Sequence, residues 1–205
     1  MKLPFIYLAS ASPRRHEILL QIGVEHEVLD IPAPPGEDEP RLPNEAPEAY
    51  VCRTAREKAI RAGQWLAAHN TTSQGTPVIP HTPILSADTT VILDGEILGK
   101  PADRHEAQHM LRRLSGSTHA VHTAVVLACG NTLHEKVSIT QVRFRTLTDT
   151  DIEAYCASGE PMGKAGAYGI QGKAGLFVAH ISGSHTGVMG LPVFETGQLL
   201  QAAAA

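Results

Sequence analysis

The 205-residue sequence predicts an α/β protein with a mixed β-sheet flanked by helices, because strand-like and helix-like patterns alternate along the chain. Short runs rich in Val, Ile and Leu are followed by longer segments whose apolar residues recur at helical spacing. A hydrophobic content of 42% is enough to bury a substantial core. We therefore expect a single domain over residues 1–205, built as one body or as two closely associated lobes.

The amino terminus is expected to form a strand followed by a helix. Residues 5–10 are largely apolar and predict the strand. Ser12 has the chemistry of a helix N-cap, Pro13 suits the first helical position, and Gly23 is a typical terminator.

The middle of the chain begins with a Pro- and acid-rich loop at residues 31–40. Apolar spacing then predicts a long helix at residues 45–68, and residues 69–83 have the polar composition of an exposed loop. Residues 84–98 predict two strands joined at Asp94-Gly95, a typical type I′ hairpin turn.

The last part of the chain begins with a helix whose start resembles a capping box, formed by Asp103 and Glu106. That helix is expected to end near Gly116. Two long strands are expected next, at residues 119–129 and 133–147, followed by a short helix that Thr148 caps. The last expected elements are a strand at residues 176–181 and a terminal helix from residue 191 onward.

Charge and composition narrow the class of function. A net charge of −4 and a pI near 6.2 give no general attraction to nucleic acid. No segment has the pattern of a membrane span, and the short apolar run at the amino terminus leads directly into two arginines, unlike a signal peptide. The three cysteines lack metal-type spacing and favour a reduced, cytoplasmic protein.

Arg14 and Arg15 are unusual because they fall in the first turn of a predicted helix, where helix electrostatics favour acidic side chains. Backbone N–H groups and two guanidinium groups would converge there on an anion with several oxygens. The pair predicts a phosphate-bearing ligand; the alternative is two solvated arginines.

Two charged residues lie where apolar residues are expected. Lys58 falls in the middle of the apolar face of the helix at residues 45–68, and Asp88 falls inside the apolar strand run. Lys58 either snorkels to water or delivers its ammonium group to a phosphate. Asp88 either caps the strand or is paired, metal-bound or catalytic. A divalent cation held with substrate phosphates would suit Asp88 together with an acid from Glu37, Asp38 or Glu39.

Glycines recur at every third position of residues 163–175, the Gly-rich segment. The alternative to an ordered loop is a flexible linker, but Tyr168, Ile170 and Gln171 favour order. Glycines there permit close approach to a ligand, and Gln171 carries both a donor and an acceptor suited to a base edge.

Seven short motifs together resemble the Maf family of nucleoside triphosphate pyrophosphatases, also known as septum-formation-inhibitor-like proteins. They occur in order and at family-like spacing, at residues 8–15, 55–59, 86–89, 99–101, 114–116, 164–172 and 190–192. The resemblance implies a two-lobed Maf/ITPase-like fold with a central substrate cleft. It also implies hydrolysis of a nucleoside triphosphate to monophosphate and pyrophosphate with Mg²⁺ or Mn²⁺, and it is compatible with a homodimer.

The same resemblance assigns roles to residues of this chain. Asp88 corresponds to the proton acceptor. Lys58 and Lys100 are the other catalytic candidates and, with Arg15 and Lys164, match phosphate-side contacts. Arg14, Thr89 and Gln171 match positions that set substrate preference. The residues at 87–89 and 167–172 resemble those of the family branch that acts on dTTP and UTP. The substrate-binding positions implied by the resemblance are Ser10, Ser12, Arg14, Arg15, Thr89, Lys164 and Gln171.

Two departures from the family pattern fall near the expected site. The acidic loop is longer than usual, which leaves the metal-side acid open among Glu37, Asp38 and Glu39, although counting back from Asn44 favours Glu39. Gly163 stands where relatives commonly carry a polar residue. A 7-methyl-GTP pyrophosphatase and a nucleotide-binding regulator of cell division that does not hydrolyse its ligand remain the alternatives.

Overall fold

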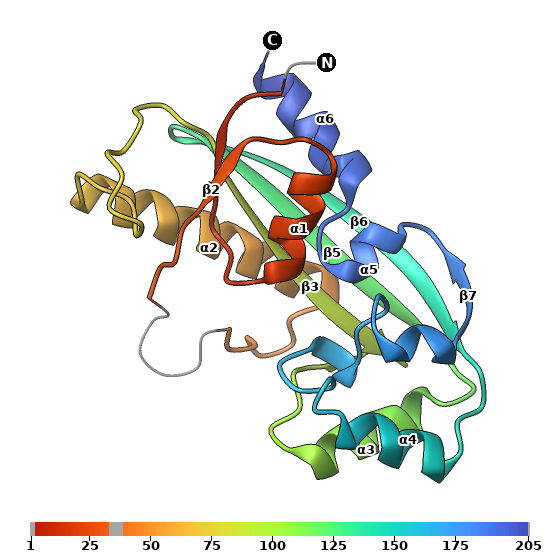
Figure 1. Cartoon of the computed structure of the whole chain (residues 1–205). Helices are drawn as coiled ribbons and strands as arrows, with labels where there is room; N and C mark the ends of the chain where they lie inside the picture. The colour runs from red at the N-terminus through yellow and green to blue at the C-terminus, as the bar shows by residue number, and fades with distance from the viewer. Residues whose placement is uncertain (1–2, 33–38, 205) are drawn as a thin grey trace. The chain divides into compact units, whose positions relative to one another are not determined.

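The computed structural model describes residues 3–32 and 39–204. Within them, seven strands form one sheet in the order β2-β1-β3-β5-β6-β7, with β4 paired to β3 (Figure 1). β1 pairs in parallel with β2 and β3, whereas β3–β4 and β6–β7 are antiparallel, so the predicted mixed sheet is confirmed. The strands are β1 (Ile6–Leu8), β2 (His26–Val28), β3 (Ile84–Leu93), β4 (Glu96–Leu98), β5 (Thr118–Cys129), β6 (Thr132–Phe144) and β7 (Val178–Ser182).

The chain divides into two compact units, each with its own core. The first unit comprises residues 1–88, 124–137 and 190–205, and the second comprises residues 89–123 and 138–189. The helices are α1 (Pro13–Gln21), α2 (Pro47–Ala68), α3 (Arg104–Leu114), α4 (Asp149–Ala157), α5 (His185–Met189) and α6 (Val193–Ala203), with 3₁₀ turns η1 (Ala165–Ala167) and η2 (Lys173–Phe177).

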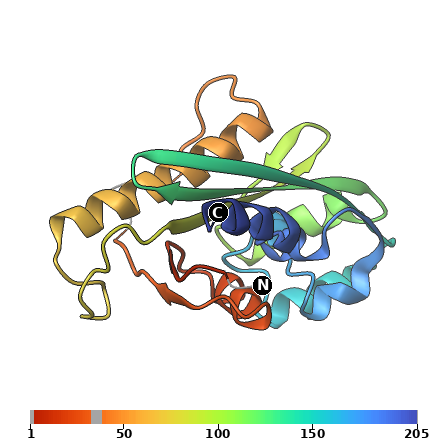
Figure 2. The ribbon, with the colours of Figure 1, turned by 90° about the horizontal axis from the view of Figure 1, so that it is seen from above.

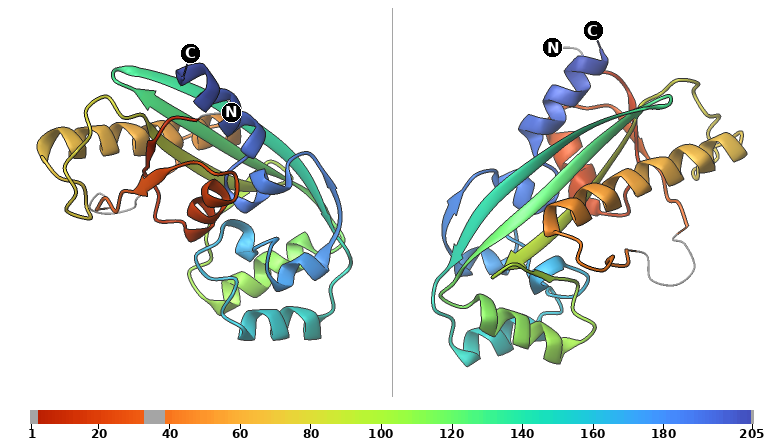
Figure 3. Two further views of the ribbon diagram at one scale, coloured as in Figure 1. Left: turned by 45° about the horizontal axis from the view of Figure 1, so that its top comes forward. Right: turned by 180° about the vertical axis from the view of Figure 1, so that it is seen from behind.

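In the first unit, helices cover both faces of the sheet. Figures 2 and 3 show α2 (orange) along one face, with α1 and α6 on the other. α2 contributes Val51, Ala55 and Ala59 to a core that also contains Tyr7 of β1 and Val126 of β5. This packing places the helix that carries Lys58 against the strand that carries Asp88.

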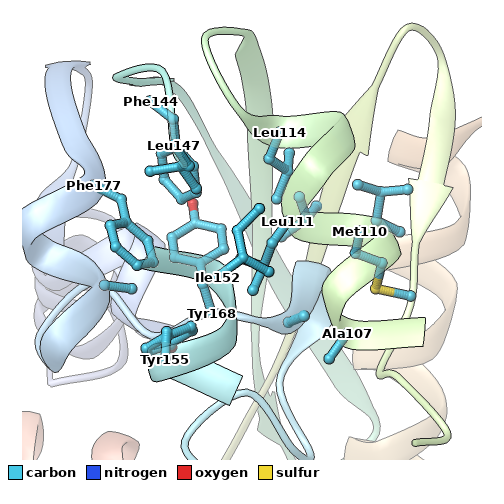
Figure 4. Close-up of a cluster of buried hydrophobic side chains, with 14 of the residues drawn as sticks. Ala107, Met110, Leu111, Leu114, Phe144, Leu147, Ile152, Tyr155, Tyr168 and Phe177 are labelled. Carbon is cyan, nitrogen blue, oxygen red and sulfur yellow. The ribbon is translucent and has the colours of Figure 1, made fainter. Parts of the chain in front are cut away.

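In the second unit, α3 and α4 lie side by side and close a separate core (Figures 1 and 4). Leu111 and Leu114 of α3 are fully buried, and they share the core with an aromatic group from β6, α4 and the Gly-rich segment. The rings of Phe144, Tyr168 and Phe177 meet edge to face at centroid distances of 4.9 to 6.0 Å. The Gly-rich segment is therefore anchored by its own aromatic residue.

Most predicted elements are confirmed because their signals are local. The hairpin forms at Asp94-Gly95, where both residues have positive φ, as a type I′ turn requires. Thr148 and Asp151 form a complete capping box at α4. At α3 the predicted box is half formed, since Asp103 accepts from the Glu106 N–H but the Glu106 carboxylate accepts from Ala102.

The sequence analysis missed β2, α5 and the two 3₁₀ turns. The predicted last strand was also placed too early, because Leu176 belongs to η2. These elements have only three to five residues each, and such short segments are stabilised by neighbouring elements rather than by their own pattern. Within the described residues, no helix combines the length and apolar character that crossing a bilayer requires.

Candidate active site

Asp88 is the buried carboxylate at the centre of the candidate site. It lies on β3 in the first unit and is only 5% exposed. Its Oδ2 accepts a hydrogen bond from the Thr54 hydroxyl at 2.8 Å, and its Oδ1 lies 2.7 Å from Lys58 Nζ. Ser86, two residues earlier on the same strand, donates to the Ala55 carbonyl of α2 at 2.8 Å. The strand and helix are thus fastened together beside the carboxylate, which is paired as its burial demands.

Lys58 joins Asp88 to a second carboxylate. Its ammonium group contacts Glu39 Oε1 as well as Asp88 Oδ1, and the side chains of Lys58 and Glu39 are each less than one-fifth exposed. The two alternatives for the metal-side acid, Glu37 and Asp38, lie outside the described residues. Among the acids that the structure describes, Glu39 is therefore the one that meets Asp88 across a shared cation.

The carboxylate pair fits a hard divalent cation. Mg²⁺ is commonly held by one or two carboxylates together with substrate phosphates, and here two carboxylates already converge on one cationic atom. No group of three or more His, Cys, Asp or Glu side chains suited to a metal occurs within residues 3–32 and 39–204. A metal at this pair would therefore need further oxygen ligands from substrate or water.

Arg15 brings a buried guanidinium group to the same unit. It is 9% exposed, donates from Nε to the Gly190 carbonyl at 2.8 Å, and donates from Nη1 to the Ser10 hydroxyl at 3.0 Å. Burial lowers the pKa of Arg15, while the carboxylates of Asp88 and Glu39 raise it. The arginine stays cationic, because guanidinium groups do not lose their proton in proteins.

Ser12 and Arg14 complete the amino-terminal part of the site. Ser12 is the N-cap of α1, as predicted, but its hydroxyl makes no capping bond; its backbone N–H donates to Ser10 Oγ at 3.2 Å. The first turn of α1 contains no acid, and the charge of Arg14 acts on Arg15. Among the described residues of this group, the three cations Arg14, Arg15 and Lys58 outnumber the two carboxylates Asp88 and Glu39, a balance that suits a polyanion.

The second unit carries the four other candidate residues. Thr89, directly after Asp88 on β3, accepts a hydrogen bond from the Thr123 hydroxyl at 3.1 Å. Lys100 and Gln171 are exposed, and Lys164 is half-buried. The Lys164 ammonium donates to the Glu160 carbonyl, and its methylene groups pass close to Gly169.

A backbone contact links Lys100 to the Gly-rich segment. The Gly166 N–H donates to the Gly99 carbonyl at 3.0 Å, directly before Lys100. Gly166 has φ +66°, and a Cβ there would lie 2.8 Å from Val91 Cγ1, so only glycine permits this approach. Within the second unit, the structure thus connects the segment that carries Lys164 and Gln171 to the residue preceding Lys100.

Besides Thr123, three residues that contact candidate site residues were given no role in the sequence analysis, although Gly190 lies in one of the seven motifs. Thr54 holds Asp88, the Gly190 carbonyl holds Arg15, and Glu160 holds Lys164. Thr54 had a usable signal in its spacing, since it precedes Lys58 by one helical turn and so shares its face.

Fold and site together define the class of protein. It is an α/β protein whose first unit gathers buried lysine, arginine and carboxylate groups beside a helix amino terminus, an arrangement that suits phosphate-bearing ligands. A family profile described as "Maf-like protein" matches residues 5–203. The chain belongs to the Maf family, which confirms the resemblance inferred from the seven motifs.

Curated relatives extend this comparison over nearly the whole chain. A protein of Bordetella pertussis (strain Tohama I) named dTTP/UTP pyrophosphatase is 60% identical over 200 residues, covering 98% of this chain and 93% of its own. Proteins with the same name from Ralstonia nicotianae and Dechloromonas aromatica are 54% and 50% identical. These alignments cover 98% and 96% of this chain, and 95% and 96% of the relatives.

Proposed function

We propose that this protein is a nucleoside triphosphate pyrophosphatase that hydrolyses dTTP and UTP to the monophosphate and pyrophosphate. The observation that carries the proposal is the convergence of Asp88 and Glu39 on Lys58, in the same unit as the buried guanidinium of Arg15. The names of relatives at 50 to 60% identity, dTTP/UTP pyrophosphatases, support both the reaction and the pyrimidine substrates.

Asp88 and Glu39 are the residues that would hold the divalent cation, Mg²⁺ or Mn²⁺. When bound, such a cation neutralises phosphate charge and favours ionisation of a nearby water. The donor set supports this assignment, since both residues offer carboxylate oxygens and both already face a cation. With a cation held by these two carboxylates, the Lys58 ammonium would no longer be needed to neutralise them and would be available to phosphate oxygens.

The reaction balances with Asp88 as proton acceptor. A water oxygen attacks the α-phosphorus, the bond from that phosphorus to the bridging oxygen breaks, and pyrophosphate leaves with the electron pair. The water gives up a proton to the Asp88 carboxylate, which the Thr54 hydroxyl orients through its other oxygen. Burial keeps bulk water away from this carboxylate and strengthens its interaction with the reacting group.

The remaining candidates divide between phosphate and base. We assign the phosphate contacts to cationic and hydroxyl groups, which match phosphate oxygens in charge and hydrogen-bonding capacity. Thr89 and Gln171 are assigned to base preference, because each can both donate and accept a hydrogen bond. The residues assigned to phosphate contacts are Ser10, Ser12, Arg14, Arg15, Lys58, Lys100 and Lys164, and Arg14 is also assigned to substrate preference.

The test is pyrophosphate release with Mg²⁺ from dTTP, UTP, CTP, ATP, GTP and 7-methyl-GTP. We expect turnover of dTTP and UTP, with monophosphate and pyrophosphate formed in equal amounts. Asp88→Asn should lower kcat by about 10²–10³ or more, as removal of a preorganised catalytic group typically does. Asp94→Asn is the matched control, since Asp94 is exposed in the hairpin turn and asparagine tolerates its positive φ.

Other outcomes of this assay discriminate the alternatives. Turnover of 7-methyl-GTP alone would mean that Thr89 and Gln171 are assigned to the wrong base. Binding of nucleotide without pyrophosphate release would favour a regulator that does not hydrolyse its ligand. Wild-type turnover in Asp88→Asn would remove that residue from the mechanism.

A further inference from the structure

Glu160 contacts the Gly-rich segment with both its backbone and its side chain, and no role has been assigned to it above. Its backbone carbonyl accepts from the Lys164 ammonium. Its carboxylate accepts from the Lys173 N–H at Oε2, 3.2 Å, and from the Tyr155 hydroxyl at Oε1, 3.1 Å. One residue therefore holds the segment near its start and near its end.

Tyr155 extends the reach of this carboxylate. Its hydroxyl donates to Glu160 and accepts from the Gly169 N–H at 3.3 Å. Burial raises the pKa of Tyr155, so the hydroxyl keeps the proton that it donates. The carboxylate thus fixes the backbone at Gly169 through Tyr155 and at Lys173 directly, two residues on either side of Gln171.

Gly172 shows how closely the carboxylate approaches the segment. A Cβ at this position would overlap the Glu160 carboxyl group. The φ of Gly172 is −100°, which other residues also adopt, so the backbone conformation does not itself demand a positive-φ residue. A side chain at position 172 would therefore require the Glu160 carboxylate to move.

We propose that Glu160 is a positioning residue for the selection of thymine and uracil over cytosine, which acts by fixing the backbone on both sides of Gln171. This inference rests on the proposed function for its substrates and on the geometry of the second unit for its mechanism. Without the carboxylate, Gln171 samples several positions, only one of which binds the base. The apparent affinity for nucleotide then falls in proportion to the fraction of molecules in that binding-competent conformation.

The first test measures selectivity between dTTP and CTP. Glu160→Ala should lower the ratio of kcat/KM for dTTP over CTP by about tenfold, the effect of losing one well-placed hydrogen bond. The loss should appear mainly as a raised KM for dTTP, with kcat within about threefold, because Asp88 and Lys58 belong to the other unit. Glu160→Gln keeps an acceptor oxygen for Lys173 and should restore part of the selectivity.

A double-substitution cycle separates positioning from general damage. Gly172→Ala should reproduce the loss of selectivity by displacing the carboxylate, whereas adding it to Glu160→Ala should cost little more, because the clashing group is already gone. Gly197→Ala is the matched control, since nothing lies within 4 Å of a Cβ there. Full additivity, or an unchanged dTTP/CTP ratio in folded Glu160→Ala, would overturn the proposal.

Amide hydrogen exchange tests the same contact without nucleotide. Peptides covering residues 168–173 should exchange faster in Glu160→Ala than in wild type or Gly197→Ala. The hydrogen bonds of two of their backbone N–H groups, at Gly169 and Lys173, depend on the carboxylate. If wild type hydrolyses no nucleotide, the proposed function fails, and this readout alone still decides whether Glu160 fixes the segment. Unchanged exchange would overturn the positioning role.

Discussion

Substitution of Lys58 by methionine should tighten Mn²⁺ binding in the absence of nucleotide. The Lys58 ammonium contacts the two carboxylates that are expected to hold the metal. Metal and ammonium therefore compete for the same oxygens, and the wild-type protein must break two ion pairs before Mn²⁺ can replace them. Methionine has similar length and no charge, so it removes the competitor while filling a similar volume.

The structure also sets the scale of the effect. Removing one partner of a buried ion pair costs about 3–5 kcal/mol of unfolding free energy. Lys58 and Glu39 keep 17% and 18% side-chain exposure, so solvent screening should bring the cost below that range, to about 2–3 kcal/mol. For a chain of this size that corresponds to a Tm lowered by roughly 4–12 °C. Mn²⁺ should recover much of this loss, since it restores positive charge between the carboxylates.

Paramagnetic titration of free Mn²⁺ would give the dissociation constants, and thermal unfolding with and without Mn²⁺ would give the linked stabilisation. We expect the dissociation constant to fall by about tenfold or more, equivalent to about 1.4 kcal/mol of relieved competition. Lys173→Met is the control, because that side chain is exposed. Equal or weaker Mn²⁺ binding in Lys58→Met would refute the reasoning.

Three further predictions follow from single contacts. Thr54→Val removes the hydroxyl that donates to Asp88. We expect kcat, measured by pyrophosphate release, to fall by about tenfold, and KM to change less. An unchanged kcat would exclude the orienting role. Gly166→Ala should destabilise the protein by about 2 kcal/mol or more through the clash with Val91 and its positive φ, seen as a lower urea midpoint than in Gly197→Ala. Burial lowers the pKa of His119 to about 4, so the unfolded chain binds its proton first as pH falls below about 6.5. The free energy of unfolding should therefore fall by about 2 kcal/mol between pH 7 and pH 5, and urea titrations at the two pH values should not show this fall in His119→Gln. An equal fall in that variant would assign the pH dependence to other groups.

Local chemistry made part of the fold predictable. The Asp94-Gly95 turn and the capping box at Thr148 depend on residues within a few positions of one another, and both are confirmed. By contrast, β2 has three residues whose strand conformation depends on parallel pairing with β1 across the intervening helix. No pattern within three residues could have indicated that partner.

Candidate site residues were predictable where a charged residue falls within an apolar sequence pattern. Lys58 and Asp88 were singled out because an ammonium group and a carboxylate interrupt apolar patterns, and the structure pairs them with each other at 2.7 Å. Thr54 interrupts nothing, because a threonine is ordinary on a helix face. Its contact with Asp88 joins residues 34 positions apart and becomes visible only when strand and helix are packed together.

The glycines of the Gly-rich segment also have structural roles that the sequence pattern alone does not distinguish. Gly166 has a positive φ and Gly172 does not, yet in the sequence both are members of one three-residue repeat. For Gly166 both the backbone and Val91 disfavour a side chain, whereas at Gly172 a side chain would have to displace a carboxylate twelve positions earlier. A glycine pattern therefore indicates that a side chain is disfavoured without saying why. At Gly172 the group responsible, the Glu160 carboxylate, is identified only from the packed structure.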